Sequence, residues 1–180
     1  SVSTSPTMRP ARAAGLSGVT PTMSTAVSRS PADARAAPTW AARPASGVVY
    51  APAVVVTTVR AVGSEDGVQV TASDGRVLDA ELAGWDLTTH VAVLKVPGLG
   101  GSAVTASTSP VRVGQLAIGV PRSWSNSVTA SAGIVAVIGG PLATGRRRAI
   151  DQVIRVTAPM HDGFSGGACL DAGGGVTGLI

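Results

Sequence analysis

A chain of 180 residues is long enough to bury the core of one domain, or of two small domains that share an interface. It contains three tryptophans, one tyrosine and one phenylalanine, so aliphatic side chains must fill the core, and its many β-branched valines favour strands. The net charge of +4 comes from residues 1–46, where five arginines face one aspartate, while the rest of the chain is balanced. The folded part therefore lacks the basic character of a nucleic-acid-binding domain, and we expect no nucleic-acid partner.

Metal, disulfide and membrane sites are also disfavoured. Cys169 is the single cysteine, so no intrachain disulfide can form, and the Cys and His residues show no zinc-binding spacing. No apolar run reaches the roughly 18 residues that a membrane helix needs. The dense cluster Arg146–Arg148 is interpreted as a solvated loop. We therefore expect no metal, no cofactor and no membrane segment, and we interpret a chain that starts with Ser as a processed form or a fragment.

The composition of the chain and its residue pattern change at Gly47. Residues 1–46 are rich in Ser, Thr, Pro, Ala and Arg without sustained periodicity, which predicts a flexible arm. Short β-rich runs then recur about every 8 to 12 residues, among them "AVVVTTVRAV", "HVAVLKV", "RVGQLAIGV" and "QVIRVTA", a spacing typical of an all-β sandwich or barrel. Asp74-Gly75 predicts a tight hairpin between two of the runs.

A Gly- and Ser-rich segment, "VPGLGGSAVTASTSP", divides the predicted strands into two groups. We therefore expect an all-β fold with two antiparallel β-barrels, one over residues 47–108 and one over residues 109–180. A cleft would lie between them.

The stretch "HDGFSGGACLDAG", residues 161–173, places Ser165 in a cluster of glycines. Such a serine is commonly a turn residue, because glycine supplies positive φ and serine hydrogen-bonds to the local backbone. "GFSGG" also fits the nucleophile elbow of α/β-hydrolases, which needs a helix directly after the serine and a histidine further on. The sequel "ACLDAGGGVTGLI" contains no histidine and has little helix tendency, which argues against the elbow.

Several blocks in order, "SGVVYAPAVVVTTVRAV", "TASDGRVLDAELAGWDLTTHVAVLKV", "VRVGQLAIGVP", "SAGIVAV" and "GFSGGACLDAGGGVTGL", resemble bacterial trypsin-like serine proteases of the HtrA/DegP type. The resemblance covers residues 46–180 and implies two six-stranded barrels with a Ser-His-Asp triad across their cleft. It puts Ser165 at the nucleophile position and the N–H groups of Gly163 and Ser165 at the oxyanion hole. It also implies that the second barrel is truncated, because "GVTGLI" leaves little chain for its last strand.

By the same resemblance, Pro159 lies at the floor of the substrate pocket with Met160 beside it. Neither is a carboxylate that would favour Lys or Arg, so a bound peptide is expected to present a small or aliphatic side chain and to pair along the cleft. The pocket could equally be collapsed and empty. Relatives of this kind often act outside the cytoplasm, so an extracytoplasmic or membrane-associated location is implied by resemblance alone.

Two positions of the triad depart from the family pattern. A block like "LTNAHVV" reads "VTTVRAV" here, so that Arg60 stands at the histidine position, and a block like "DLAVLK" reads "HVAVLKV", so that His90 stands at the aspartate position. A guanidinium has no acceptor and stays protonated, so Arg60 cannot be a general base. His161 lies four residues before Ser165 and is an alternative candidate for the base, but its position aims it poorly at the Ser165 hydroxyl.

Three hypotheses follow. The first is a protease homologue that has lost endopeptidase activity and binds peptides or partner proteins in the cleft. The second is a weakly active or rewired serine endopeptidase that uses Ser165, and the third is a structural domain of a larger protein. Loss of the base favours the first, because removing the histidine of a serine protease costs about as much in kcat as removing the whole triad, about 10⁶-fold in subtilisin.

Overall fold

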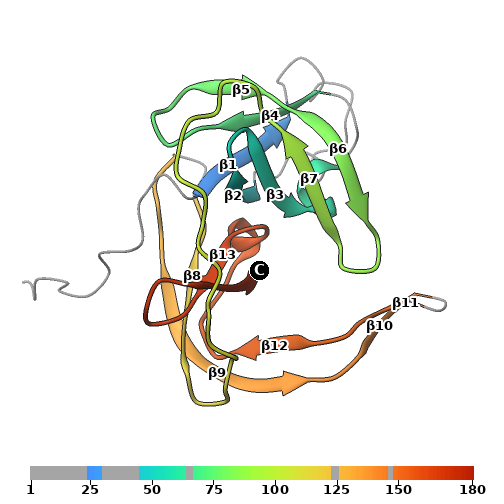
Figure 1. Cartoon of the computed structure of the whole chain (residues 1–180), viewed down its shortest axis with the longest axis vertical. Coiled ribbons are helices and arrows are strands. Elements are labelled where there is room, and N and C mark those ends of the chain that lie inside the picture. The colour runs from blue at the N-terminus through green and yellow to red at the C-terminus, as the bar shows by residue number, and fades with distance from the viewer. Residues whose placement is uncertain (1–23, 30–44, 64–66, 123–125, 146–147) are drawn as a thin grey trace, which may run out of the picture.

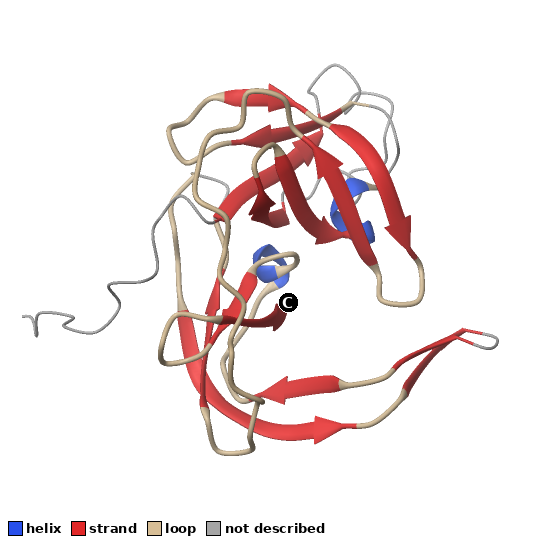
Figure 2. Cartoon of the chain, viewed as in Figure 1, coloured by secondary structure: helices blue, strands red, loops and turns tan. Residues whose placement is uncertain are grey.

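In the part of the chain that the structure describes, nearly all regular elements are β-strands, and most of them form two large antiparallel sheets (Figures 1 and 2). The computed structural model describes residues 24–29, 45–63, 67–122, 126–145 and 148–180. Within these residues the helical elements are two short turns, α2 (Val59–Val62) and the 3-10 turn η3 (Asp162–Phe164). The expectation of an all-β fold is confirmed.

The first sheet has seven strands in the order β5-β4-β1-β2-β3-β7-β6, with every neighbouring pair antiparallel. Their bounds are β1 Ser24–Arg29, β2 Ala45–Ala51, β3 Val54–Thr58, β4 Val68–Thr71, β5 Val77–Asp79, β6 Glu81–Asp86 and β7 Val91–Lys95. The end strands β5 and β6 are separated by Ala80 alone, so the sheet curls round into a barrel. Alternation along β3 and β7 turns Val55 and Leu94 fully into its core.

The second sheet has five strands in the order β12-β9-β8-β13-β14. Their bounds are β8 Leu116–Val120, β9 Ser131–Gly139, β12 Val153–Val156, β13 Ala168–Leu170 and β14 Val176–Leu179. Between β9 and β12 the chain makes a separate hairpin of β10 (Leu142–Gly145) and β11 (Arg148–Ile150). The end strands β12 and β14 do not pair with each other, so this sheet is a half-barrel with two open edges, in agreement with a truncated second barrel.

The expected boundary of the arm is wrong in one part. The sequence predicts a flexible arm over residues 1–46, but β1 lies inside the first sheet, between β4 and β2. Thr25 and Val27 of this strand are buried, and so are Ala45 and Ser46 at the start of β2. The strand could not be predicted from its own residues, because it is formed by pairing with strands that are distant in the sequence. The other residues before Ala45 lie outside the described residues.

The segment that joins the sheets is hydrogen-bonded to both of them. Val104 N–H donates to the carbonyl of Val49 in the first sheet at 2.9 Å, and Ser107 N–H donates to the carbonyl of Val176 in the second, also at 2.9 Å. The β10–β11 hairpin adds a further link, since Thr144 Oγ1 donates to the carbonyl of Thr88 at 3.0 Å. These contacts hold the sheets in a defined relation, which positions the Ser165 turn against the end of β3.

Candidate active site

The turn that carries Ser165 is held by its own backbone. Phe164 N–H donates to the His161 carbonyl at 2.9 Å and Gly167 N–H donates to the Phe164 carbonyl at 2.8 Å. Gly166 has a φ of +79°, a left-handed conformation that glycine adopts without strain. The chain then enters strand β13, not a helix, which excludes the α/β-hydrolase elbow.

The Ser165 hydroxyl is hydrogen-bonded to the hydroxyl of Thr58. Its Oγ lies 3.0 Å from Oγ1 of Thr58, the last residue of β3. The Ser165 carbonyl accepts a hydrogen bond from Ser46 N–H at 2.8 Å. A threonine hydroxyl is not a base near neutral pH, so the Thr58 contact orients the serine oxygen without activating it.

Arg60 follows Thr58 by two residues and lies in the short helix α2. Its side chain is exposed and makes no hydrogen bond or ion pair with any residue that the structure describes. The guanidinium offers only donors, so it has no atom that can take a proton from Ser165.

His90 lies in the turn between β6 and β7. It has a φ of +57°, and its carbonyl accepts a hydrogen bond from Val59 N–H at 2.8 Å, so it holds the start of α2 through its backbone. Asp86, the nearest acidic residue before it in the chain, is already engaged. The backbone N–H of Thr88 first, and then the hydroxyl of Thr89, hold the pKa of the Asp86 carboxyl below its usual value. Asp86 is therefore a turn-capping residue.

The Gly163 N–H, one of the two expected oxyanion donors, is engaged by a neighbouring side chain. Gly163 N–H donates to Nδ1 of His161 at 3.1 Å, and the Gly163 carbonyl accepts from Oγ of Ser46 at 3.2 Å. One of the two donors is therefore already satisfied inside its own loop.

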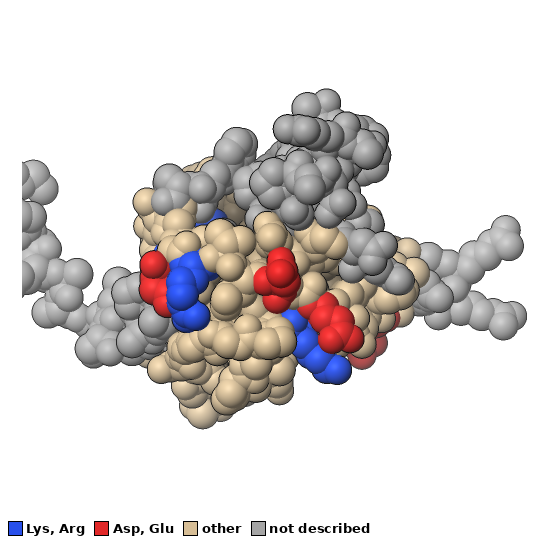
Figure 3. All heavy atoms as spheres, turned by 90° about the horizontal axis from the view of Figure 1, so that it is seen from above, with Lys and Arg blue, Asp and Glu red and all other residues tan. Residues whose placement is uncertain are grey.

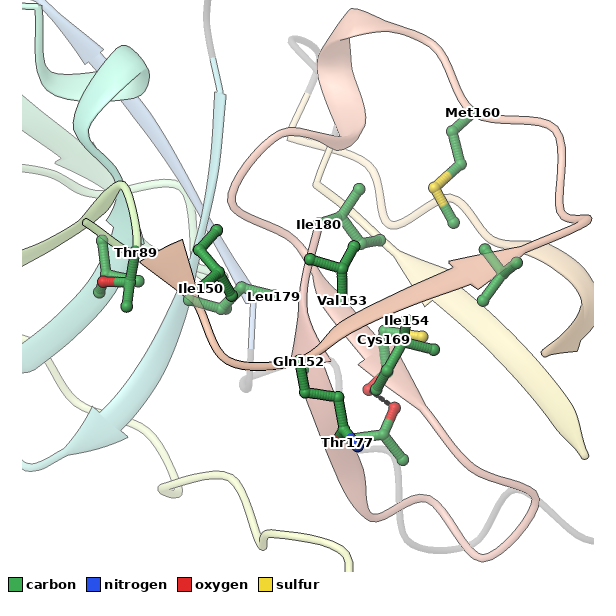
Figure 4. Close-up of a pocket in the computed structure, with 13 residues that line it drawn as sticks. Thr89, Ile150, Gln152, Val153, Ile154, Met160, Cys169, Thr177, Leu179 and Ile180 are labelled. Atoms are coloured by element: carbon green, nitrogen blue, oxygen red, sulfur yellow. Dashed lines mark hydrogen bonds between the residues drawn. The ribbon is translucent and has the colours of Figure 1, made fainter. Parts of the chain in front are cut away.

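A cavity of about 430 Å³ is lined mainly by the second sheet, with Thr89 and Val91 of the first sheet also in its wall (Figure 4). Side chains from β12 and from the end of the chain form much of its wall, including Val153, Ile154, Leu179 and Ile180. Met160 lines this cavity, whereas the exposed Pro159 is not part of its wall. The lining is mainly aliphatic and contains no charged residue, which suits small or aliphatic groups.

Other kinds of site find little support in the described residues. No group of three or more His, Cys, Asp or Glu residues among them could hold a metal ion, and Cys169 is buried as a free thiol. None of the helices described there is long and apolar enough to cross a membrane. On the face drawn in Figure 3, the few cationic and anionic side chains lie close to one another and form no extended patch of one sign.

Two residues of this site were not anticipated from the sequence. Thr58 is the hydroxyl partner of Ser165, although the two are 107 positions apart, and Ser46 binds Gly163 across 117 positions. The sequence offered one signal for Thr58. It stands two residues before Arg60, and Arg60 occupies the expected histidine position.

Comparison with known proteins decides the family. A family model described as a trypsin-like peptidase domain matches residues 45–179. The chain belongs to the trypsin-like peptidase family. Among curated relatives, serine protease PepD of Mycobacterium tuberculosis is 35% identical over 118 residues, which cover 61% of this chain and 25% of PepD. A probable periplasmic DegP-like serine endoprotease of Brucella suis is 33% identical over 128 residues, which cover 69% of this chain and 24% of that protein.

The chain therefore spans about a quarter of the length of these two relatives. Solved structures support the same fold. The crystal structure of the Mycobacterium tuberculosis protease Rv3671c in its inactive form matches with a TM-score of 0.72 and 21% identity, over 88% of this chain and 77% of that one. Deg5 matches with a TM-score of 0.73 and 20% identity, over 89% and 79%. This trypsin-like peptidase domain is thus homologous to proteases of the HtrA and DegP type.

Proposed function

We propose that this trypsin-like domain has lost endopeptidase activity and binds peptides or partner proteins in the cleft between its two sheets. One observation carries the proposal: the hydroxyl at the nucleophile position, Ser165, is paired with Thr58 and not with an imidazole. Arg60, at the expected histidine position, supplies no acceptor. Without a base, a serine protease retains only the contribution of the oxyanion hole and of binding, about 10³ to 10⁴ over water, which is too slow for useful peptide turnover.

The mode of binding follows from the cavity. Its aliphatic wall beside Met160 favours a peptide that presents a small or aliphatic side chain, and an extended backbone would pair along the cleft. The periplasmic description of the Brucella suis relative supports an extracytoplasmic location for this domain as well.

Labelling with a fluorophosphonate tests the loss of activity. The unmodified chain should label no faster than a Ser165→Ala control, because no acceptor nitrogen activates the hydroxyl. Arg60→His alone should help little, since an imidazole without its carboxylate partner loses about 10⁴ in kcat. The pair Arg60→His with His90→Asp should restore measurable labelling.

The same experiment separates the alternatives. Strong labelling of the unmodified chain that disappears in His161→Ala would establish a rewired serine hydrolase in place of a binding domain. Absence of labelling combined with absence of any peptide binding would favour a purely structural domain.

Peptide binding is tested by fluorescence anisotropy with labelled extended peptides that carry a valine or leucine. Met160→Asp should weaken binding about tenfold or more, because it puts a carboxylate beside an aliphatic wall. Val77→Asp is the matched control, since Val77 is an exposed side chain of β5 in the first sheet and does not line the cavity. Equal loss in both variants, or none in either, would contradict the assignment of the cavity.

A further inference from the structure

His161 is turned back onto the loop that carries the serine. Its Nδ1 accepts the Gly163 N–H at 3.1 Å, and its ring meets the ring of Phe164 edge to face, with centroids 4.7 Å apart at 83°. Phe164 is 4% exposed and anchors the arrangement in the core, whereas the outer side of His161 is exposed. The imidazole is therefore held by two contacts within three residues of its own position.

The contact with Gly163 defines the tautomer of the neutral imidazole. A backbone N–H can only donate, so the Nδ1 atom that it meets must carry a free lone pair. In a neutral imidazole the proton then sits on Nε2. The atom that a general base would need is consequently used by the backbone of Gly163.

Oxyanion stabilisation requires backbone donors aimed at the place where negative charge develops, at about 2.7 to 3.1 Å from it. The Gly163 N–H points at His161, and Oγ of Ser46 holds the carbonyl of the same residue from the other sheet. We propose that His161 is a positioning residue that keeps the Gly163 amide out of the oxyanion site, so that this site is incomplete independently of the missing base. The inference rests on the proposed assignment of Ser165 to the nucleophile position.

The first test is spectroscopic and uses the unmodified chain. Nitrogen NMR at a pH where the imidazole is neutral should find the His161 Nδ1 unprotonated and the Nε2 protonated. The Gly163 amide proton should be shifted downfield by its hydrogen bond. A His161 that carries its proton on Nδ1 would overturn the proposal.

Two substitutions of nearly equal shape isolate the acceptor atom. His161→Asn keeps an oxygen close to the place of Nδ1, and His161→Leu replaces that acceptor with a methyl group. The downfield shift of the Gly163 amide should persist in the Asn variant and disappear in the Leu variant. The same shift in both variants would show that the imidazole does not hold this amide.

The second test measures reactivity with a repaired base. In the background Arg60→His with His90→Asp, His161→Leu should raise the rate of fluorophosphonate labelling by about two- to tenfold over His161 or His161→Asn, because it releases the Gly163 amide from one net hydrogen bond. Equal rates for the three residues at position 161 would contradict the proposal. Labelling of the unmodified chain would contradict the proposed function while leaving the NMR result intact, so the two failures are distinguishable.

Discussion

Substitution of Gly166 by alanine tests how the serine turn is held between the sheets. A Cβ atom at this position would lie 2.0 Å from the carbonyl oxygen of Ser46 and 2.5 Å from Oγ1 of Thr57, both in the first sheet. The φ of +79° is in addition a conformation that an L-residue adopts only with strain. Gly166 is therefore a point of close approach between the turn and the first sheet.

The cost can be worked out from these contacts. The left-handed conformation costs alanine about 1 to 2 kcal/mol. The Ser46 carbonyl must also move by more than 1 Å to reach an ordinary contact distance, which disrupts its 2.7 Å hydrogen bond from Thr57 and disturbs the bond from Ser46 N–H to Ser165. Each such bond contributes about 0.5 to 1.5 kcal/mol. We expect a total loss of about 2 to 5 kcal/mol, a large part of the 5 to 15 kcal/mol that stabilises a typical domain.

Urea unfolding followed by circular dichroism measures the change. Gly178→Ala is the matched control, because a Cβ atom added there would have no heavy atom within 4 Å and the φ of Gly178 is not in the left-handed region. The control should change the free energy of unfolding by no more than about 0.5 kcal/mol. A difference between the two variants of less than about 1 kcal/mol would refute the steric argument.

Two further predictions concern pH and the N-terminal residues. Hydrogen bonds from the Ser107 hydroxyl first, and then from the Gly175 N–H, lower the pKa of the Asp171 carboxyl below 3.8 in the folded state. The ionised carboxylate therefore stabilises the fold above pH 3.8, and this stabilisation is lost as the pH falls through the lower pKa of the folded state. Asp171→Asn should flatten the fall in melting temperature below pH 4, and an unchanged pH profile would contradict this role. A chain that starts at Ala45 lacks β1 but keeps the whole of β2, and it should lose cooperative thermal unfolding; native-like unfolding would show that β1 is dispensable.

Much of the fold could be predicted because its signals are local. The valine-rich runs that form β3 and β7 and the tight turn at Asp74-Gly75 each act over a few residues. In the structure, β4 and β5 pair on either side of that turn, and Gly75 has a φ of +88°. Local rules of this kind do not require knowledge of the partner strand.

The parts that were missed depend on distant partners. The segment Ser24–Arg29 has small and polar residues and no strong strand signal of its own, yet it is a central strand, since β2 and β4 pair with its two edges. Thr58 likewise carries no motif. Its importance arises because the docking of the two sheets brings it within 3.0 Å of Ser165. Contacts of this kind are set by topology and not by neighbouring sequence.

The glycines of "GFSGG" illustrate the same difficulty for function. Gly166 is required by the approach of the Ser46 carbonyl whether or not Ser165 is reactive, so its presence says nothing about catalysis. The Ser165 hydroxyl also has a structural use, because its bond to Thr58 joins the turn to the end of β3. A serine in this turn is therefore compatible with docking of the sheets alone.

The two proposed defects differ in how readily they are reversed. The bond from Gly163 N–H to His161 is a single hydrogen bond, worth about 0.5 to 1.5 kcal/mol, so a ligand that accepts this amide can displace the imidazole. No ligand can give Arg60 a lone pair, and the Thr58 hydroxyl does not become a base when a peptide binds. A peptide in the cleft can thus reshape the oxyanion loop without restoring hydrolysis. Binding accompanied by movement of the Gly163 amide, with no cleavage, is the behaviour that this combination of residues predicts.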